Sequence, residues 1–390
     1  MLVAIGLAGG EGRSQQRSTT RTIHASSEPA TPVAVVARRV QRIRDLRFRR
    51  LPPARRVSPA QAEHAGLADF DRSYPAAARH ADEALLERLG ALPRGADLRH
   101  EIGSAFRDQV GGYYDPRTKR LAVVGGPASQ GAAGDIVLAH ELNHALEDQR
   151  YGLDEPGSQA AIDDRSLANS ALVEGTATSV MLDYARRFLD PGQALSDLLP
   201  AALQSSRSAK LPRYLQDSLM FPYDGGLAFV NALYARLHGW ALVDYALRRR
   251  RPASTEQVLH PQRYLADERP LPVPAPPAPG RGWRPVRHGT FGEFDTAELL
   301  RLAGAQDAAD AAGGWGGGRY ALWRHGRAIA MALVWRWDTR RDARQAAAAL
   351  ATYRRFAARR GPVALATHGA VTALGFAPTP ALARRVAGAS

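Results

Sequence analysis

The chain has 390 residues, 45% of them hydrophobic and 23% charged, which is enough for two or three globular domains with a sizeable core. Its formal net charge is +14, yet the basic residues are scattered and no aromatic platform lies between them, so we expect no nucleic-acid partner. The sequence contains no cysteine, which excludes disulfides and cysteine-ligated metals.

The first 32 residues are predicted to be a disordered segment. Met1 to Gly10 is apolar but too short to cross a membrane, and we interpret it as the remnant of a signal or anchor segment. Gly10 to Pro32 is rich in Ser, Thr, Arg and Gln, a composition that cannot build an apolar core.

Hydrophobic periodicity predicts structure from Val33 onward. Val36, Val40 and Ile43 recur at helical spacing, and Arg44 is among the arginines expected on the exposed side of that helix. Further predicted elements are a strand from Leu46 to Val57, a helix that starts at Ser58-Pro59, a helix from Pro75 to Leu89, and a hairpin of Gln109 to Tyr114 and Arg120 to Val124.

The stretch HELNHALEDQ contains the H-E-x-x-H pattern of zinc-dependent hydrolases, from His140 to His144. On an α-helix, residues four apart differ by only about 40° in direction, so both imidazoles reach one metal ion. Glu141 projects to the other side of His144, where it can hold a water on that ion without ligating it.

A third ligand is expected on the next helical stretch, ALVEGTAT, where Glu174 stands among small or apolar residues. A lone carboxylate in such a run is costly to bury unless it is paired or bound to a metal. Catalytic zinc sites usually have three protein ligands and one open position.

These two stretches resemble the gluzincin group of zinc metallopeptidases, which includes thermolysin, and are most similar to a poorly characterised branch of bacterial secreted or membrane-anchored zinc peptidases. The resemblance covers mainly residues 100–265. It implies one zinc ion per chain, held by His140, His144 and Glu174, with Glu141 as the general base. It also implies a peptide or protein substrate and an extracellular or cell-envelope location, and it leaves peripheral contact with membrane or cell wall open.

Thermolysin-like enzymes carry an Asp four residues after the third ligand that orients a histidine, and here that position is Thr178. We therefore propose Asp148 for that role, with a solvated carboxylate as the alternative. In gluzincins a strand before the metal-binding helix forms the edge of the cleft and pairs with the extended substrate. Tyr113-Tyr114 and Leu121 to Val124 are expected to form that edge, and an ordinary sheet edge is the alternative.

Two residues are candidates for stabilising the oxyanion that forms during peptide hydrolysis. Tyr223 lies between a proline and a predicted glycine turn, ahead of a helix from Leu227 to Leu237, and its alternative role is packing. His260 is the second candidate, and its alternative role is to cap a helix end before Pro261.

The proline-dense stretch from Ala266 to Gly280 is predicted to be an extended spacer at a domain boundary. Beyond it we expect a small α+β module for substrate, cell wall or autoinhibition. Its predicted elements are a helix from Glu298 to Ala312, a glycine turn at Gly313 to Gly318, paired strands at Arg319 to Trp323 and Ala328 to Trp337, a helix from Asp338 to Ala358, a last strand and a short helix.

The sequence therefore predicts an α+β protein with a disordered segment (1–32), a mostly helical metallopeptidase domain with a small sheet at the active-site edge (33–265), a proline-rich linker (266–284) and an accessory α+β domain (285–390). The predicted function is hydrolysis of peptide bonds by a zinc-activated water. The alternative is a non-catalytic zinc-binding scaffold that acts in regulation or cell-surface binding, although a structural site has no need of Glu141. Charge-driven binding to nucleic acid or to an acidic surface is a second alternative.

Overall fold

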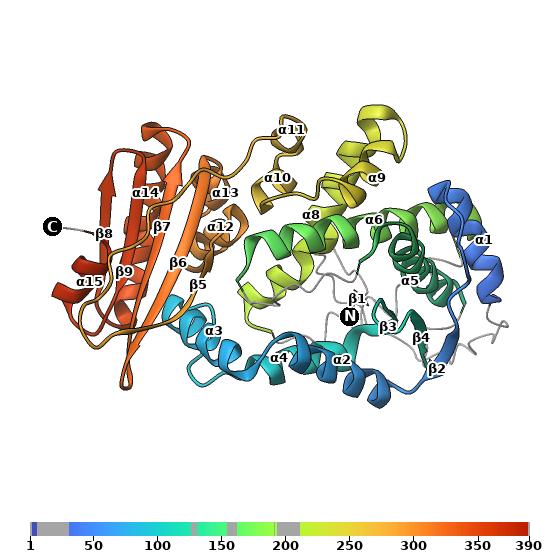
Figure 1. The fold of residues 1–390 in the computed structure, drawn as a ribbon, viewed down its shortest axis with the longest axis horizontal. Helices are drawn as coiled ribbons and strands as arrows, with labels where there is room; N and C mark the ends of the chain where they lie inside the picture. The colour runs from blue at the N-terminus through green and yellow to red at the C-terminus, as the bar shows by residue number, and fades with distance from the viewer. Residues whose placement is uncertain are drawn as a thin grey trace, which may run out of the picture. The chain divides into compact units, whose positions relative to one another are not determined.

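The computed structural model describes residues 2–5, 31–125, 131–153, 162–190, 192 and 211–388. They form an α+β fold, which confirms the predicted fold class (Figure 1). A further predicted helix, Leu198 to Leu203, and most of the predicted disordered segment lie outside the described residues. Within that segment the prediction of disorder is wrong at Leu2–Ile5, which forms a strand.

The chain divides into two compact units, each built from several segments. Unit 1 comprises Met1–Asp69, Ile102–Glu155 and Thr176–Lys210, and unit 2 comprises Phe70–Glu101, Pro156–Gly175 and Leu211–Ser390. This division does not coincide with the predicted boundary at 266–284, because two earlier segments join the C-terminal part in unit 2. The division between Gly175 and Thr176 falls inside one continuous helix, α6.

Unit 1 combines helices with a four-stranded sheet. Its elements, some of which continue into unit 2, are β1 (Leu2–Ile5), α1 (Val33–Arg44), β2 (Ala54–Val57), α2 (Pro59–Ser73), α4 (Leu98–Gln109), β3 (Val110–Asp115), β4 (Arg120–Val124), α5 (Gly131–Tyr151) and α6 (Asp164–Phe188). The predicted hairpin is confirmed as β3 and β4, whereas the strand expected from Leu46 to Val57 is limited to Ala54–Val57, strand β2.

The strand order in this sheet is β1-β3-β4-β2. Strands β1 and β4 both pair antiparallel with β3, and β2 pairs parallel with β4. The expected open edge at Tyr113-Tyr114 and Leu121 to Val124 is therefore wrong, because β3 and β4 each have neighbours on both sides. The outer strands are β1 and β2.

Unit 2 contains a five-stranded antiparallel sheet in the order β5-β6-β7-β9-β8. Its remaining elements are α3 (Ala76–Leu89), α8 (Arg213–Leu237), α9 (Ala241–Arg248), α10 (Thr255–Leu259), α11 (Pro261–Leu265), β5 (Arg284–Thr290), α12 (Glu293–Leu302), α13 (Ala308–Ala312), β6 (Trp315–His325), β7 (Ala328–Trp337), α14 (Arg340–Ala357), a 3-10 turn (Ala358–Arg360), β8 (Val363–His368), β9 (Val371–Phe376) and α15 (Pro380–Val386). The paired strands and the helix expected after them are confirmed, and two further strands follow that helix instead of one.

Helix α3 belongs to unit 2 because its side chains and backbone bond to the C-terminal sheet and helices. Asp82 forms an ion pair with Arg287 of β5, with 2.9 Å between Oδ1 and Nε. The carbonyl oxygen of Leu89 accepts a 2.8 Å hydrogen bond from the Tyr353 hydroxyl of α14.

The glycine run is not a turn as predicted, because β6 begins at Trp315 within it. A β-carbon on Gly317 would lie 2.5 Å from the carbonyl oxygen of Leu271, and one on Gly318 would lie 2.2 Å from that of Phe291. Glycine is required here so that other backbone segments can cross β6 closely. One of them is the proline-rich segment, whose Leu271 N–H donates a 2.6 Å hydrogen bond to the Gly316 carbonyl.

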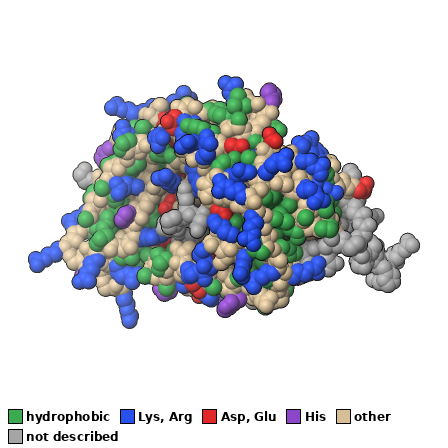
Figure 2. Space-filling model, turned by 45° about the vertical axis from the view of Figure 1, so that its right-hand side comes forward, with side chains coloured by type: hydrophobic (Ala, Val, Ile, Leu, Met, Phe, Trp, Pro, Cys, Tyr) green, Lys and Arg blue, Asp and Glu red, His purple; other side chains and the backbone are tan. Residues whose placement is uncertain are grey.

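Among the described residues, no helix is long and apolar enough to cross a lipid bilayer. Lys and Arg side chains are dispersed among apolar and neutral groups over the face shown in Figure 2. The positive charge on that face is thus spread out rather than gathered into a single patch.

Candidate metal centre

Helix α5 carries His140 and His144 on one buried face, as the spacing predicts. The two residues are 1% and 0% exposed, and their Nε2 atoms lie 3.0 Å apart. Two nitrogen ligands at 2.0–2.1 Å from one tetrahedral zinc ion would be about 3.3 Å apart. The observed separation is therefore close to what a shared metal ion requires.

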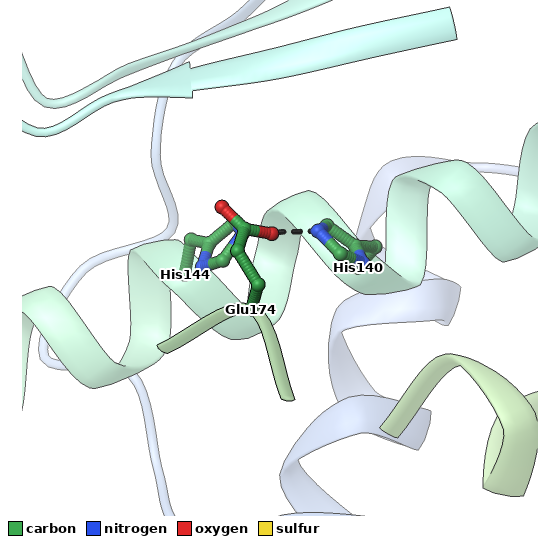
Figure 3. A group of neighbouring side chains, drawn as sticks. All are labelled: His140, His144 and Glu174. Atoms are coloured by element: carbon green, nitrogen blue, oxygen red, sulfur yellow. Dashed lines mark hydrogen bonds between the residues drawn. The ribbon is translucent and has the colours of Figure 1, made fainter. Parts of the chain in front are cut away.

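Glu174 of α6 completes the group. Its ligand atom and those of His140 and His144 all lie within 4.8 Å of one another, and all three residues are buried. In Figure 3 the Glu174 carboxylate faces the two imidazoles. The structure thus brings together the three residues that the sequence predicts as metal ligands.

A second group of acidic residues, Glu256, Glu268 and Asp338, could also hold a cation by distance alone. Arg263 already fills its centre. The guanidinium lies 3.1 Å from Glu256 and 2.7 Å from Asp338, and it also pairs with Glu268. This group is better described as an arginine site than as a metal site.

Glu141 lies on α5 beside the ligands and is held against strand β3. It is 1% exposed, and its Oε2 accepts a 2.6 Å hydrogen bond from the backbone N–H of Tyr114. A β-carbon on Gly112 would lie 3.1 Å from the Ala122 carbonyl oxygen and 3.3 Å from Val137 Cγ1, so the space between β4 and α5 is tight at this point. Strand and helix together fix the orientation of the carboxylate.

The structure corrects the expected role of Asp148, which bonds to Tyr114 and Lys119 instead of orienting a histidine. Its Oδ2 accepts 2.7 Å bonds from the Tyr114 hydroxyl and from Lys119 Nζ, and its Oδ1 accepts one of 3.0 Å from Leu153 N. Asp148 is 5% exposed, so it is not a solvated carboxylate either. It links the end of β3 to α5, because Tyr114 bonds to Asp148 through its hydroxyl and to Glu141 through its backbone N–H.

A buried polar network next to the ligands was missed from the sequence. Glu147 Oε2 accepts a 2.8 Å hydrogen bond from Thr176 Oγ1, and its Oε1 lies 3.1 Å from Arg44 Nη2. Asn143 Nδ2 lies 3.4 Å from the same Thr176 oxygen. The network joins α1, α5 and α6 beside His144 and two residues beyond Glu174.

Arg44 was expected on the exposed side of its helix, but it is 1% exposed. The only available signal was that the arginine lies next to the apolar Ile43 in an otherwise amphipathic helix. Burial raises the pKa of the Glu147 carboxyl, and the neighbouring positive charge of Arg44 acts in the opposite direction.

Tyr223 lies inside helix α8 and not beside a turn, which corrects the prediction. Of the two glycines after it, Gly226 allows close helix packing: a β-carbon there would lie 2.0 Å from the carbonyl oxygen of Ala171. A β-carbon on Gly175 would in turn lie 2.3 Å from the carbonyl oxygen of Gly226. Helix α8 therefore crosses α6 with the two backbones in contact around Glu174, and Tyr223, 5% exposed, lies about one turn from the crossing.

His260 ends helix α10 and its Nε2 lies 2.8 Å from Glu293 Oε1. This hydrogen bond raises the pKa of His260 above its ordinary value. The pair lines a pocket of about 520 Å³ whose lining contains none of the predicted metal ligands. The position before Pro261 at a helix end agrees with the alternative role given for this histidine.

One family model matches the chain, described as a domain of unknown function (DUF8575), over residues 283–385. This segment runs from just before β5 into α15 and contains none of the predicted catalytic or metal-binding residues. No curated protein and no solved structure matches the chain.

Proposed function

We propose that this protein is a zinc-dependent metallopeptidase that hydrolyses peptide bonds. The observation that carries the proposal is the buried group of His140, His144 and Glu174, in which the two Nε2 atoms face each other at 3.0 Å. Two imidazoles and one carboxylate are a common ligand set for catalytic zinc, and they leave a position open. The residues present therefore fit one zinc ion.

His140, His144 and Glu174 would hold the ion. When bound, zinc would act as a Lewis acid that lowers the pKa of water and polarises a scissile carbonyl. The Glu141 carboxylate would accept the proton of the attacking water and then donate it to the nitrogen of the leaving amine. Its hydrogen bond from Tyr114 N supports this role, because the base is held in place before the substrate arrives.

Tyr223 is our first candidate for donating a hydrogen bond to the oxyanion. Its place on the helix that crosses α6 around Glu174 supports this choice. His260 remains the second candidate, but it would have to exchange its bond to Glu293 for one to the oxyanion.

The test is hydrolysis of a mixed peptide library by zinc-loaded protein, with the products read by mass spectrometry. Glu141→Gln retains the shape of the side chain and an oxygen acceptor for Tyr114 N–H, but it cannot take up a proton. We expect it to bind one zinc per chain and to lose about 10²–10⁴ of the activity. Glu268→Gln, the same change at an exposed glutamate, should leave the activity unchanged.

Elemental analysis of zinc, combined with the hydrolysis assay, decides between the two predicted functions. If both the natural protein and Glu141→Gln bind zinc and neither cleaves any peptide, the non-catalytic scaffold is the better description. If neither binds zinc, the metal centre itself is wrong.

A further inference from the structure

Strand β1 covers the side of β3 that faces away from β4. Leu2 pairs with Tyr114, Val3 with Tyr113 and Ile5 with Val110, all antiparallel. The register shifts between Val3 and Ile5, and β1 is only four residues long. Among the described residues, β3 is its one neighbour in the sheet.

The covered strand is the one that holds the proposed general base. Tyr114, the partner of Leu2, donates its N–H to Glu141, and the sheet lies against α5, which β1 also contacts. A chain segment paired with Val110–Tyr114 therefore runs beside the helix that carries His140, Glu141 and His144.

Pairing with a strand edge depends on backbone hydrogen bonds, so a peptide of different sequence can take the same place. Substrate and β1 cannot both occupy it. An outer strand of four residues with an irregular register has few bonds to lose when it is displaced.

We propose that Leu2–Ile5 is an intramolecular ligand of the β3 edge, and that this segment and an extended peptide substrate exclude each other. The inference rests on the proposed peptidase function for the identity of the competitor. It assigns the edge to extended peptides of small and branched apolar residues, because Leu-Val-Ala-Ile is the segment bound there.

The first test measures binding and does not depend on hydrolysis. The probe is a fluorescent peptide with the sequence LVAIGLAG, titrated into metal-free protein and followed by anisotropy. Replacement of residues 2–5 by Gly-Ser-Gly-Ser removes the β-propensity of this segment. We therefore expect the probe to bind this variant, the Gly-Ser chain, at least tenfold more tightly than it binds the natural chain. In the matched control, Gly-Ser-Gly-Ser replaces Arg13 to Gln16 instead. This variant should bind the probe with the same affinity as the natural chain. A probe with proline at its second position should bind poorly, because it lacks one backbone N–H.

A second variant holds β1 in place reversibly. Val3 and Tyr113 are register partners, and the chain contains no cysteine, so Val3→Cys/Tyr113→Cys can form only the intended disulfide within one chain. The oxidised form should exclude the probe, and reduction should restore binding. Equal probe affinity in both forms, or in the natural and Gly-Ser chains, would overturn the competition.

Failure of this inference and failure of the peptidase proposal give different results. In the zinc-loaded protein, competition predicts a lower KM in the Gly-Ser chain with kcat unchanged. Tighter probe binding by the Gly-Ser chain without any hydrolysis would support the competition and contradict the peptidase proposal. Hydrolysis with identical KM and identical probe affinity in both chains would support the peptidase proposal and contradict the competition.

Discussion

Arg44 and Glu147 form an ion pair that is removed entirely from solvent, with 3.1 Å between Nη2 and Oε1 and both side chains 0% exposed. Glu147 also accepts the hydroxyl of Thr176, so the pair connects the end of α1 to both helices that carry predicted metal ligands. A charge in such a place is costly to leave without its counter-charge.

Arg44→Met should therefore lower the free energy of unfolding by about 3–5 kcal/mol, measured by urea denaturation. The control is Arg186→Met, which removes an exposed ion pair with Asp183 in which the arginine is 73% exposed. That change should cost at most about 1 kcal/mol. Equal losses in the two variants would mean that the buried pair has no special role.

Zinc should raise the melting temperature, because an ion that binds only the folded chain stabilises it. His144→Ala should abolish this increase and lower the zinc affinity measured by calorimetry. His64→Ala, the same change at an exposed histidine, should retain both properties. A zinc-dependent shift that survives in His144→Ala would place the metal elsewhere.

Tyr223→Phe should lower kcat by about 10–10³ with little change in KM or zinc content, because it removes one donor to the oxyanion. His260→Ala should leave kcat near its natural value if Tyr223 is that donor. Tyr245→Phe, at a tyrosine 44% exposed, is the control for loss of a hydroxyl. A large loss of kcat in His260→Ala together with a kcat near the natural value in Tyr223→Phe would favour His260 as the donor to the oxyanion.

Gly226→Ala should destabilise the protein by about 3 kcal/mol or more, since its β-carbon would lie 2.0 Å from the Ala171 carbonyl oxygen. It should also weaken zinc binding, because any shift of α6 at Ala171 displaces Glu174. At Gly239 an added β-carbon has its nearest neighbour 4.0 Å away. Gly239→Ala should be close to neutral in thermal unfolding and zinc titration.

The His260–Glu293 hydrogen bond should make stability depend on pH. Because the pKa of His260 is raised in the folded chain, its contribution is fully present below the ordinary value of 6.5 and is lost as pH rises through the folded pKa. The stability difference between the natural chain and His260→Gln, measured by denaturation, should therefore shrink as the pH rises from 6 towards 9. A difference that stays constant over this range would show that protonation of His260 is not involved.

Local periodicity was sufficient to predict the helices around His140 and Glu174, the β3–β4 hairpin and the fold class. Local periodicity failed where contacts with a segment distant in the sequence determine the role of a residue. The glycines at 225–226 locally favour a turn, but Gly226 packs against the backbone of α6 and Gly225 against the ring of Phe221. Asp148 follows His144 at helical spacing, yet Tyr114 and Lys119 determine its orientation.

The proline-rich segment has a practical consequence for dissecting this protein. Leu271 N–H donates a hydrogen bond to the Gly316 carbonyl, and Arg319 Nη1 donates a 3.3 Å hydrogen bond to the Val273 carbonyl. This stretch therefore packs against strand β6 of the C-terminal sheet. The matched domain begins at residue 283, after that stretch has ended. A fragment produced from the match alone would leave the glycine backbone of β6 uncovered. An excised module should therefore start before Pro270.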